Sequence, residues 1–410
     1  MRIALTSNGP GEFAGWVRPL VSELLRQAPD SEITLFFVPD DYATGREPDV
    51  ARALFPGVRV VAARDYVRFA LGRGGENMPA GADAVLYLGG DLMHAARVHA
   101  LLGGKAFAYK FSRKRYGKTF ARVYAVDAKN AAQLTAWGTP AANVETVGNL
   151  AIDGALGEAA GAFGAGAGDA ERIAQQGVLI MPGTRKHEVA NLIPFFLEAA
   201  VRLRALAPEL PVAFGISPFT PVDEVARALA SGGHPNVWGA RGRVVEAAGG
   251  IALQPESGGE PVPVVRDALR AAERARLVVT IPGTKCIELA ALGVPAIVCV
   301  PLNAPEVVVI NGPLQYLDRL PLLGIPLKRA AVVAVDARFP VTAQPNMDAG
   351  EMLMPEMRGA LTPGHVAKRI AEYAADDAAR AAASERLRAL YAAQAGAAAR
   401  MARSLLAAAS

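Results

Sequence analysis

Residues 277–300 read LVVTIPGTKCIELAALGVPAIVCV, and this stretch decides the fold class. Residues 277–280 form a β-branched run, residues 286–291 have a helix-forming composition, and residues 295–300 form a second apolar run. A Gly-Thr pair separates the first run from the helix, as in a tight strand-to-helix turn. This order predicts a βαβ unit, in which the two strands are parallel.

The same alternation continues through most of the chain. In the first half, strands are expected at residues 1–6, 33–38, 84–88, 106–109, 123–126 and 144–147. In the second half, strands at 178–181 and 212–216 precede helical segments, and a helix is expected at 264–273. The sequence therefore predicts an α/β protein with two halves, each containing a doubly wound, mostly parallel sheet.

The expected domain boundary lies in a segment without clear hydrophobic periodicity. Residues 158–169, EAAGAFGAGAGD, are rich in Gly and Ala and are interpreted as part of an interdomain linker. We expect an N-terminal Rossmann-like domain over residues 1–170 and a second one over residues 171–360. Residues 361–410 are Ala-rich and are predicted to form a helical tail, which packs on the first domain or on a partner subunit of a homodimer. Ligands in this class bind at the carboxyl ends of the strands, so a cleft between the domains is expected.

The composition excludes several classes of protein. With 52% hydrophobic and 20% charged residues over 410 positions, the chain is not expected to be disordered. No apolar run reaches the roughly 18–20 residues that a membrane-spanning helix needs. Cys286 and Cys299 lie in apolar stretches and the five histidines lack zinc-site spacing, so we expect no disulfide framework and no metal centre. These features favour a cytoplasmic protein.

Two carboxylates follow strands of the first half. Residues 7–15, SNGPGEFAG, come directly after the first strand, and Glu12 in this segment is a candidate general base. The glycines permit close backbone approach to an anion, but the pattern is not the dinucleotide-binding GxGxxG, and an ordinary turn is the alternative. Asp91 follows the strand at 84–88, where it is either a helix N-cap or a second candidate base, with His94 nearby.

A basic and aromatic run occupies residues 105–122, KAFAYKFSRKRYGKTFAR, with seven Lys or Arg residues and no acidic one. A solvated basic face is the ordinary explanation. The interleaved aromatic residues raise a second possibility, contact with an anionic lipid headgroup or with nucleic acid. Because the net charge is only +4, an anionic lipid or phosphate is favoured and nucleic acid is not.

Two similar segments of the second half follow strands. In residues 181–189, MPGTRKHEV, the helix start with Gly183 and Thr184 and the side chain of Arg185 would form a diphosphate site. Alternatively, Thr184 caps the helix with Glu188 in its first turn. Either interpretation places polar groups at a strand end.

The second of these segments is residues 280–288, TIPGTKCIE. Gly283 and Thr284 can contact phosphate, and Glu288 can accept both hydroxyls of a nucleotide ribose. Glu288 is otherwise a surface charge near a helix N-terminus. Two Gly-Thr helix starts in one half are more informative than either alone.

Several of these segments resemble segments of the lipid-A-disaccharide synthases. MPGTRKHEV is similar to their PGSR-x-x-EV segment, and IPGTKCIELAALGVPAIV is similar to their SGTAALE segment. Residues 125–154 are similar to the stretch that ends the family's first domain. AQPNMDAGEMLMPEM, residues 343–357, resembles its L-P-N segment near the C-terminus. The resemblance covers most of the chain from about residue 84 onward.

The resemblance implies the GT-B glycosyltransferase fold, with two Rossmann-like domains, a UDP-sugar donor in the second and an acceptor on the first. It adds Asn346 to the donor-binding residues. It implies no cofactor and no obligatory metal, since the UDP-sugar is a substrate. The family acts on a lipid acceptor at the membrane surface, so peripheral attachment to the inner face of the cytoplasmic membrane is expected.

The sequence departs from the family in its first half. The family's opening loop reads GE-x-S-G-D. The corresponding residues here, 11–16, read GEFAGW, so Trp16 stands where the family has Asp. The basic run replaces a Ser/Trp-rich segment. The predicted acceptor or membrane residues are therefore Gly11, Trp16, Lys110, Arg113, Lys114 and Arg115, and Asp91 matches a family carboxylate.

Together these features predict a hexosyltransferase that moves a GlcNAc-type sugar from a UDP-sugar to a lipid or glycolipid acceptor. Asp91 or Glu12 would take the proton of the acceptor hydroxyl. Two alternatives remain: an enzyme of the UDP-sugar 2-epimerase type, and a non-catalytic protein that binds a sugar nucleotide or a lipid.

Overall fold

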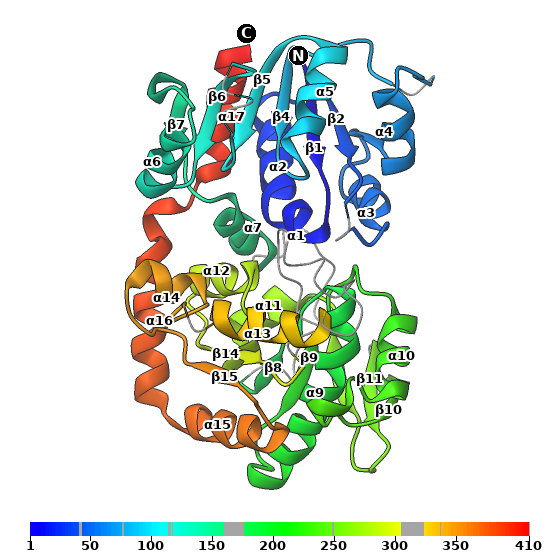
Figure 1. Ribbon diagram of the computed structural model, residues 1–410, viewed down its shortest axis with the longest axis vertical. Coiled ribbons are helices and arrows are strands. Elements are labelled where there is room, and N and C mark those ends of the chain that lie inside the picture. The colour runs from blue at the N-terminus through cyan, green and yellow to red at the C-terminus, as the bar shows by residue number, and fades with distance from the viewer. Residues whose placement is uncertain are drawn as a thin grey trace. The chain divides into compact units, whose positions relative to one another are not determined.

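The computed structural model describes residues 1–40, 43–75, 78–113, 116, 118–159, 176–247, 250–304, 324–336 and 338–409. The chain divides into two compact units (Figure 1). The first unit contains Met1–Gly157 together with Tyr391–Ser410, and the second contains Glu158–Leu390.

A seven-stranded parallel sheet forms the centre of the first unit, in the order β3-β2-β1-β4-β5-β6-β7. The strand order reverses between β1 and β4, which makes this edge the switch point of a doubly wound sheet. The strands are β1 (Arg2–Ser7), β2 (Glu32–Phe37), β3 (Arg59–Val61), β4 (Ala84–Tyr87), β5 (Lys105–Tyr109), β6 (Phe120–Ala125) and β7 (Val144–Thr146).

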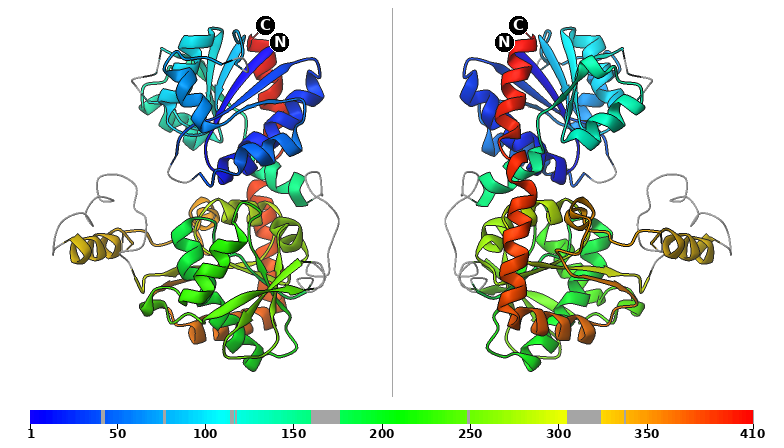
Figure 2. Two further views of the ribbon diagram at one scale, coloured as in Figure 1. Left: turned by 90° about the vertical axis from the view of Figure 1, so that its right-hand side faces the viewer. Right: turned by 90° about the vertical axis from the view of Figure 1, so that its left-hand side faces the viewer.

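Helices cover both faces of this sheet (Figures 1 and 2). A helical stretch begins with α1 (Pro10–Glu12), passes through a π-helical turn at Phe13–Val17 and continues as α2 (Arg18–Gln27). The others are α3 (Glu47–Leu54), α4 (Ala63–Ala70), α5 (Leu92–Leu102), α6 (Ala128–Ala136) and α7 (Leu150–Ala159). Leu20, Val21 and Leu24 of α2 are fully buried, as the spacing of an amphipathic helix requires.

The last helix of the chain, α17 (Ala397–Ala409), belongs to the first unit and packs against α2 (Figure 2). The carboxylate of Asp153 accepts hydrogen bonds from the backbone N–H groups of Gly396 and Ala398, both at 2.6 Å. This carboxylate therefore caps the start of α17, where unpaired N–H groups favour a negative charge.

An eight-stranded mixed sheet forms the second unit, in the order β10-β11-β12-β9-β8-β13-β14-β15. The strand β11 is antiparallel to both β10 and β12, the other pairs are parallel, and the strand order reverses between β8 and β13. The strands are β8 (Val178–Ile180), β9 (Val212–Gly215), β10 (Gly242–Ala247), β11 (Gly250–Pro255), β12 (Val262–Val265), β13 (Leu277–Thr280), β14 (Ala296–Pro301) and β15 (Glu356–Gly359).

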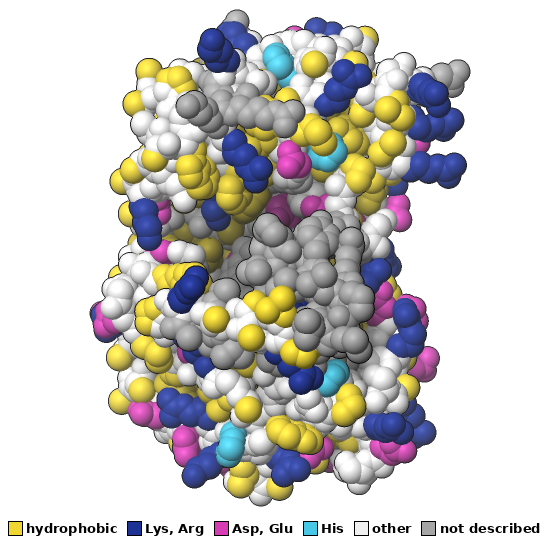
Figure 3. Space-filling model, in the orientation of Figure 1, with side chains coloured by type: hydrophobic (Ala, Val, Ile, Leu, Met, Phe, Trp, Pro, Cys, Tyr) yellow, Lys and Arg dark blue, Asp and Glu magenta, His cyan; other side chains and the backbone are white. Residues whose placement is uncertain are grey.

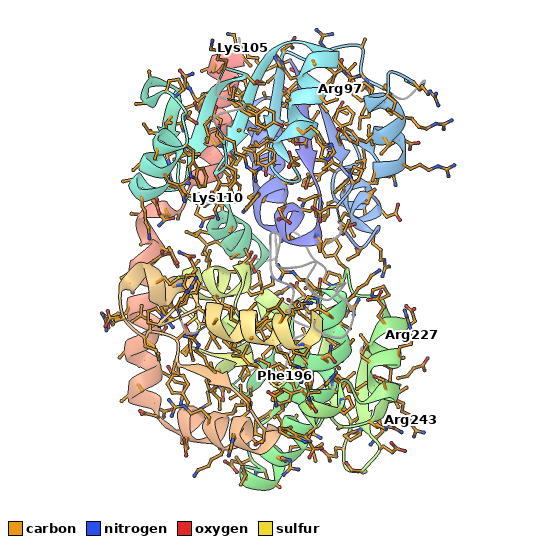
Figure 4. All side chains as sticks on the ribbon, in the orientation of Figure 1. Arg97, Lys105, Lys110, Phe196, Arg227 and Arg243 are labelled. Atoms are coloured by element: carbon orange, nitrogen blue, oxygen red, sulfur yellow. The ribbon has the colours of Figure 1, made fainter. Side chains whose placement is uncertain are left out.

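The core of the second unit is built around α9 (Lys186–Leu206), whose Phe195 and Phe196 are fully buried (Figure 4). Helix α15 (Pro363–Ala375) packs against α9 and closes this core. The remaining helices are α10 (Val222–Ser231), α11 (Ala268–Arg274), α12 (Thr284–Ala291), α13 (Gly324–Asp336), α14 (Gln344–Ala349) and α16 (Asp377–Tyr391).

The predicted strands are present in both units, but one predicted helix is wrong at its start. Residues 262–265, expected in part to begin a helix at 264, form β12, because two neighbouring strands pair with this β-branched segment. The helix α11 begins only at Ala268. Besides β12, four strands were not anticipated: β3, β10, β11 and β15.

The predicted tail at 361–410 is divided in the structure. Its first part, with α15 and α16, belongs to the second unit, and its last part, with α17, belongs to the first. Most of the predicted linker at 158–169 and the predicted boundary at residue 170 lie outside the described residues, whereas the division into units falls between Gly157 and Glu158.

Candidate functional site

Two Pro-Gly-Thr turns lie side by side in the second unit. One follows β8 and the other follows β13, and these two strands pair directly at the switch point. The N–H of Met181 donates to the carbonyl of Val279 at 2.7 Å. Gly183 has φ +101°, and a Cβ at this position would collide with the Glu188 carboxylate and with Ile281. The turns are therefore tightly packed against each other and require glycine at 183.

Glu188 caps the start of α9. Its Oε2 accepts hydrogen bonds from the backbone N–H groups of Thr184 and Arg185, both at 2.9 Å, and its Oε1 lies 3.4 Å from the Arg185 guanidinium. Thr184 is therefore not the cap, which corrects that interpretation of the sequence. Two of the N–H groups expected to bind diphosphate are already paired with Glu188.

The start of α12 is different. Gly283 stands at its N-cap position without a side-chain cap, and a Cβ added there would meet nothing within 4 Å. Both Gly283 and Thr284 are exposed. The N-terminus of α12 thus faces open space, and unpaired N–H groups at such a position favour an anion.

Glu288 lies one turn into α12 and is 3% exposed. Its Oε2 is 2.5 Å from Nζ of Lys285, whose side chain is 32% exposed. Sequence reasoning did not include Lys285 among the site residues, although its i,i+3 spacing from Glu288 was a signal for this pair. A buried carboxylate requires such a partner.

Asn346, predicted to bind the donor, has a complete set of contacts within the protein. It is fully buried, its Oδ1 accepts from the N–H groups of Leu353 and Met354, and its Nδ2 donates to the Met354 carbonyl and to Glu356. The side chain therefore holds together the segment from α14 to β15. A direct contact with a ligand would require breaking one of these bonds.

Cations gather near the start of α9. Burial lowers the pKa of His187, the Glu188 carboxylate raises it, and the charges of Arg185 and Lys328 lower it further. Lys328, on α13, is 6% exposed and was not predicted from the sequence. The two cations acting on His187 make this region favourable for a phosphate.

Glu12 and Asp91 follow β1 and β4, the two strands at the switch point of the first unit. A Cβ on Gly89 would lie 3.3 Å from Cβ and Cγ of Glu12 and would collide with Asn8. Burial raises the pKa of Tyr87, and the nearby charges of Glu12 and Asp91 raise it further. The two predicted catalytic carboxylates, Glu12 at the end of α1 and Asp91 at the N-cap of α5, therefore both act on the same phenol.

Asp91 is the N-cap of α5, since its Oδ1 accepts the N–H of Met93 at 2.8 Å. The capping interpretation is correct, and it leaves the carboxylate exposed and compatible with a second role. His94, one turn on, is half-buried, and its Nδ1 lies 2.8 Å from the hydroxyl of Tyr66. Burial lowers the pKa of His94, while the charge of Asp91 raises it.

Trp16 is 9% exposed and packs edge-on against Tyr109, with ring centroids 5.5 Å apart. Nζ of Lys110 lies 5.6 Å from the centroid of the Trp16 ring. This burial is incompatible with the predicted contact between Trp16 and a membrane. Gly11 is exposed, and a Cβ there would meet nothing within 4 Å.

The basic run is not one surface. Lys105 and Lys110 lie at opposite ends of β5, as Figure 4 shows. Lys105 donates to the carbonyl of Ala408 at 2.7 Å, and Arg122 forms an ion pair with Glu145 at 2.7 Å. These ends of the run are engaged in the fold. Lys114 and Arg115 lie outside the described residues.

A cavity of about 600 Å³ opens at the carboxyl ends of β4 and β5. Figure 3 shows hydrophobic side chains exposed among basic ones on the first unit. The cavity brings together the predicted residues Asp91 and Arg113, and adds Trp137, which sequence reasoning missed. It is lined by Tyr87, Gly90, Asp91, Leu92, Phe111, Ser112, Arg113 and Trp137.

In the described part of the chain, no three His, Cys, Asp or Glu side chains are grouped so that they could hold a metal ion. Among the helices of the described residues, none combines the length and the apolar character needed to cross a membrane.

Comparison with known proteins identifies the fold. No protein-family model and no curated protein matches the chain. A Listeria monocytogenes protein described as a UDP-N-acetylglucosamine 2-epimerase is similar in structure, with a TM-score of 0.54 and 14% identity, over 100% of this chain and 96% of that one.

Two other solved structures are similar. The kitacinnamycin glycotransferase has a TM-score of 0.54 and 16% identity, over 99% and 98% of the two chains. The S. aureus MnaA structure with UDP has a TM-score of 0.50 and 13% identity, over 91% and 95%. These likenesses, together with the two sheets and the helical tail, confirm the predicted α/β, GT-B class with two Rossmann-like domains.

Proposed function

We propose that this protein is a GT-B hexosyltransferase that moves a GlcNAc-type sugar from a UDP-sugar to a lipid or glycolipid acceptor. The observation that carries the proposal is the pairing of the two Pro-Gly-Thr turns at the switch point of the second unit, with Glu288 one turn behind. Nucleotide ligands of doubly wound sheets bind at such a point. The UDP in the similar S. aureus structure also favours this ligand.

In this proposal the donor binds at the exposed start of α12. Gly283 and Thr284 contact the diphosphate, and Glu288 accepts the ribose hydroxyls. Lys285 lies beside that carboxylate and can turn its ammonium toward a phosphate, because its side chain is partly exposed. The side chains of Arg185 and Lys328 add positive charge on the α9 side.

The chemical step breaks the glycosidic bond to UDP and forms one to the acceptor hydroxyl oxygen. Negative charge builds on the leaving diphosphate, where the α12 N-terminus and Arg185 stabilise it. The acceptor proton passes to a carboxylate of the first unit, Asp91 or Glu12. Neither role requires a bound metal, so activity in the presence of a chelator is the expected outcome.

The donor site is tested by thermal shift and calorimetry with UDP, UDP-GlcNAc, GDP-, ADP- and dTDP-sugars and NAD, without added metal. A ligand at 100 times its Kd adds about 2.7 kcal/mol of stability. Stabilisation confined to the UDP compounds, and lost in Glu288→Ala, supports the proposal. Stabilisation by none of them contradicts it and leaves a non-catalytic binding protein.

A UDP-sugar 2-epimerase is the second candidate, favoured by the structural likeness to the Listeria monocytogenes protein. The two functions differ in their products. Incubation with UDP-GlcNAc alone, followed by chromatography, yields a second UDP-sugar or free sugar with an epimerase. A transferase releases UDP at a substantial rate only when an acceptor is added.

The lipid acceptor places the enzyme at the inner face of the cytoplasmic membrane in this proposal. Liposome flotation with anionic vesicles tests this, using the triple replacement of Arg113, Lys114 and Arg115 by Ser. Unchanged flotation of the variant contradicts membrane attachment through these residues. Size-exclusion chromatography with light scattering tests the proposed homodimer.

A further inference from the structure

The cavity of the first unit has the size of a small-molecule site. Its volume of about 600 Å³ falls in the range of roughly 300–1,000 Å³ typical of ligand pockets. It lies at the carboxyl ends of β4 and β5, beside the switch point that holds the candidate base Asp91. A ligand in this cavity would therefore reach the carboxylate.

Two aromatic side chains give the cavity an apolar wall. Trp137, at the end of α6, is 40% exposed, and Phe111, after β5, is 38% exposed. Exposed aromatic side chains on one concavity are typical of a site that contacts hydrocarbon or a sugar face. The buried ring of Trp16 supports Phe111 from behind, with centroids 6.4 Å apart.

A tight backbone turn at Lys110 positions Phe111 in this apolar wall. Lys110 has φ +65°, and the N–H of Phe111 donates to the Tyr109 carbonyl at 2.7 Å, which closes a γ-turn. Asn130 holds the turn by donating to the Lys110 carbonyl at 3.2 Å. A conformation this rare in a non-glycine residue is retained where the surroundings enforce it. The turn brings Phe111, Ser112 and Arg113 to the cavity.

Polar groups complete the lining. Arg113 is exposed and forms no ion pair with any residue that the structure describes. Ser112 is 1% exposed, and its Oγ has no hydrogen-bond partner among the described residues. A guanidinium binds phosphate or carboxylate through two parallel hydrogen bonds, so an anionic group is the complementary ligand chemistry.

We propose that this cavity binds the acceptor as a single amphiphilic molecule that carries an anionic group beside its apolar portion. The anion pairs with Arg113, the apolar portion lies against Trp137 and Phe111, and a hydroxyl faces Asp91. The term acceptor rests on the proposed transferase function, whereas the binding of an anionic amphiphile does not.

Calorimetric titration of the full chain tests the cavity with three probes below their micelle concentrations: octyl phosphate, octanoate and octyl β-D-glucoside. We expect octyl phosphate or octanoate to bind at least ten times more tightly than the uncharged glucoside. The two anions distinguish a phosphate-bearing from a carboxylate-bearing acceptor. Equal affinity for all three probes overturns the proposal.

Variants assign the binding to the cavity. Arg113→Ser should remove the preference for the anion, with a loss of at least tenfold for octyl phosphate and little change for the glucoside. Trp137→Ala should weaken all three probes, and Trp137→Phe should restore most of the affinity. The matched controls are Arg243→Ser, labelled in Figure 4, and Trp238→Ala. Both residues are exposed on the second unit, and both variants should leave binding unchanged.

Two further arms separate the possible failures. Binding to phosphatidylglycerol vesicles without binding of any monomeric probe overturns the cavity proposal in favour of a membrane surface. Stabilisation by UDP is measured on the same variants. If octyl phosphate binds wild-type protein and UDP does not, the transferase function is rejected and the amphiphile site is retained. If UDP binds and octyl phosphate does not, only the amphiphile site is rejected.

Discussion

Oε2 of Glu188 lies 2.9 Å from the backbone nitrogen of Thr184, so the first of the two Pro-Gly-Thr turns is capped by its own helix. The second turn has no such cap, and the carboxylate one turn into its helix, Glu288, pairs with Lys285 instead. The two turns have the same Pro-Gly-Thr sequence but present different surfaces. This difference separates a structural carboxylate from a candidate binding carboxylate.

Replacement of each carboxylate by its amide distinguishes the two roles. Glu188→Gln weakens the cap and should cost about 1 kcal/mol, within the range of helix-cap losses, while the Kd for UDP stays within threefold. Glu288→Gln should weaken UDP at least tenfold with a smaller change in Tm. Thermal unfolding and calorimetry measure both. Loss of UDP binding in Glu188→Gln alone would reverse the assignment.

Asp91→Asn separates capping from proton transfer. Asn is as good an N-cap as Asp, so α5 and the Tm should be preserved. If Asp91 is the base, kcat should fall by about 10²–10⁴-fold, since the amide cannot accept the proton. Asp127→Asn is the matched control, because Asp127 caps α6 in the same way. An active Asp91→Asn variant would transfer the role to Glu12, tested by Glu12→Gln.

Asn346→Ala should lower the free energy of unfolding and leave the affinity for UDP nearly unchanged. The substitution leaves the buried N–H of Met354 without its partner, at a cost of about 1–3 kcal/mol, and leaves the N–H of Leu353 only the Glu351 carbonyl at 3.2 Å. Urea unfolding should show the loss, and the folded protein should keep its affinity for UDP within about threefold. Gln344→Ala, which removes only a solvent-exposed hydrogen bond to Asp348 on the same helix, is the control. A fully stable variant without UDP binding would show a direct ligand contact instead.

Glu356 should make the segment from α14 to β15 sensitive to acid. Partial burial raises the pKa of Glu356, but hydrogen bonds from Ala343, Thr342 and Asn346 outweigh burial and hold it below its ordinary value of 4.5. The carboxylate therefore stabilises the fold above pH 4.5, and this contribution is lost as the pH falls through the lowered pKa.

The Tm difference between wild type and Glu356→Gln should accordingly be large at pH 7 and shrink below pH 4.5. Thermal unfolding at several pH values measures it. Glu372→Gln, which removes an exposed charge on α15, should show a smaller difference across the same range. A constant difference for Glu356→Gln down to pH 3 would exclude ionisation as the cause.

Local pattern predicted most of the parallel strands, because runs such as β4, β8, β9 and β13 are apolar and buried on both faces. It missed β3 and β15, which are also parallel to their neighbours. The hairpin of β10 and β11 was missed because its strands, GRVVEA and GIALQP, have weak alternation and lie toward one edge of the sheet. The strand β12 was assigned to a helix for a related reason. Its state is decided by pairing with β9 and β11, which no local window contains.

The site was partly predictable for similar reasons. Glu12, Asp91, Gly283 and Glu288 follow strands, so topology alone placed them at sheet edges. The exposure of Trp137 and the ion pair of Lys285 depend on packing between distant segments or on side-chain geometry. The burial of Trp16 could not be predicted from its sequence neighbours either, because its aromatic partners are Tyr109 at the end of β5 and Phe111 in the turn that follows.

The position of α17 has a consequence for the order of folding during synthesis. The first unit begins the chain, yet α2 is covered only when residues 397–409 arrive, after residues 158–390 have been made. At about 5–20 residues per second, translation of that interval takes roughly 10–50 s. Throughout that time the apolar side of α2 that meets α17 has no native partner. The nascent first unit therefore exposes an apolar surface, of the kind that a ribosome-bound chaperone binds.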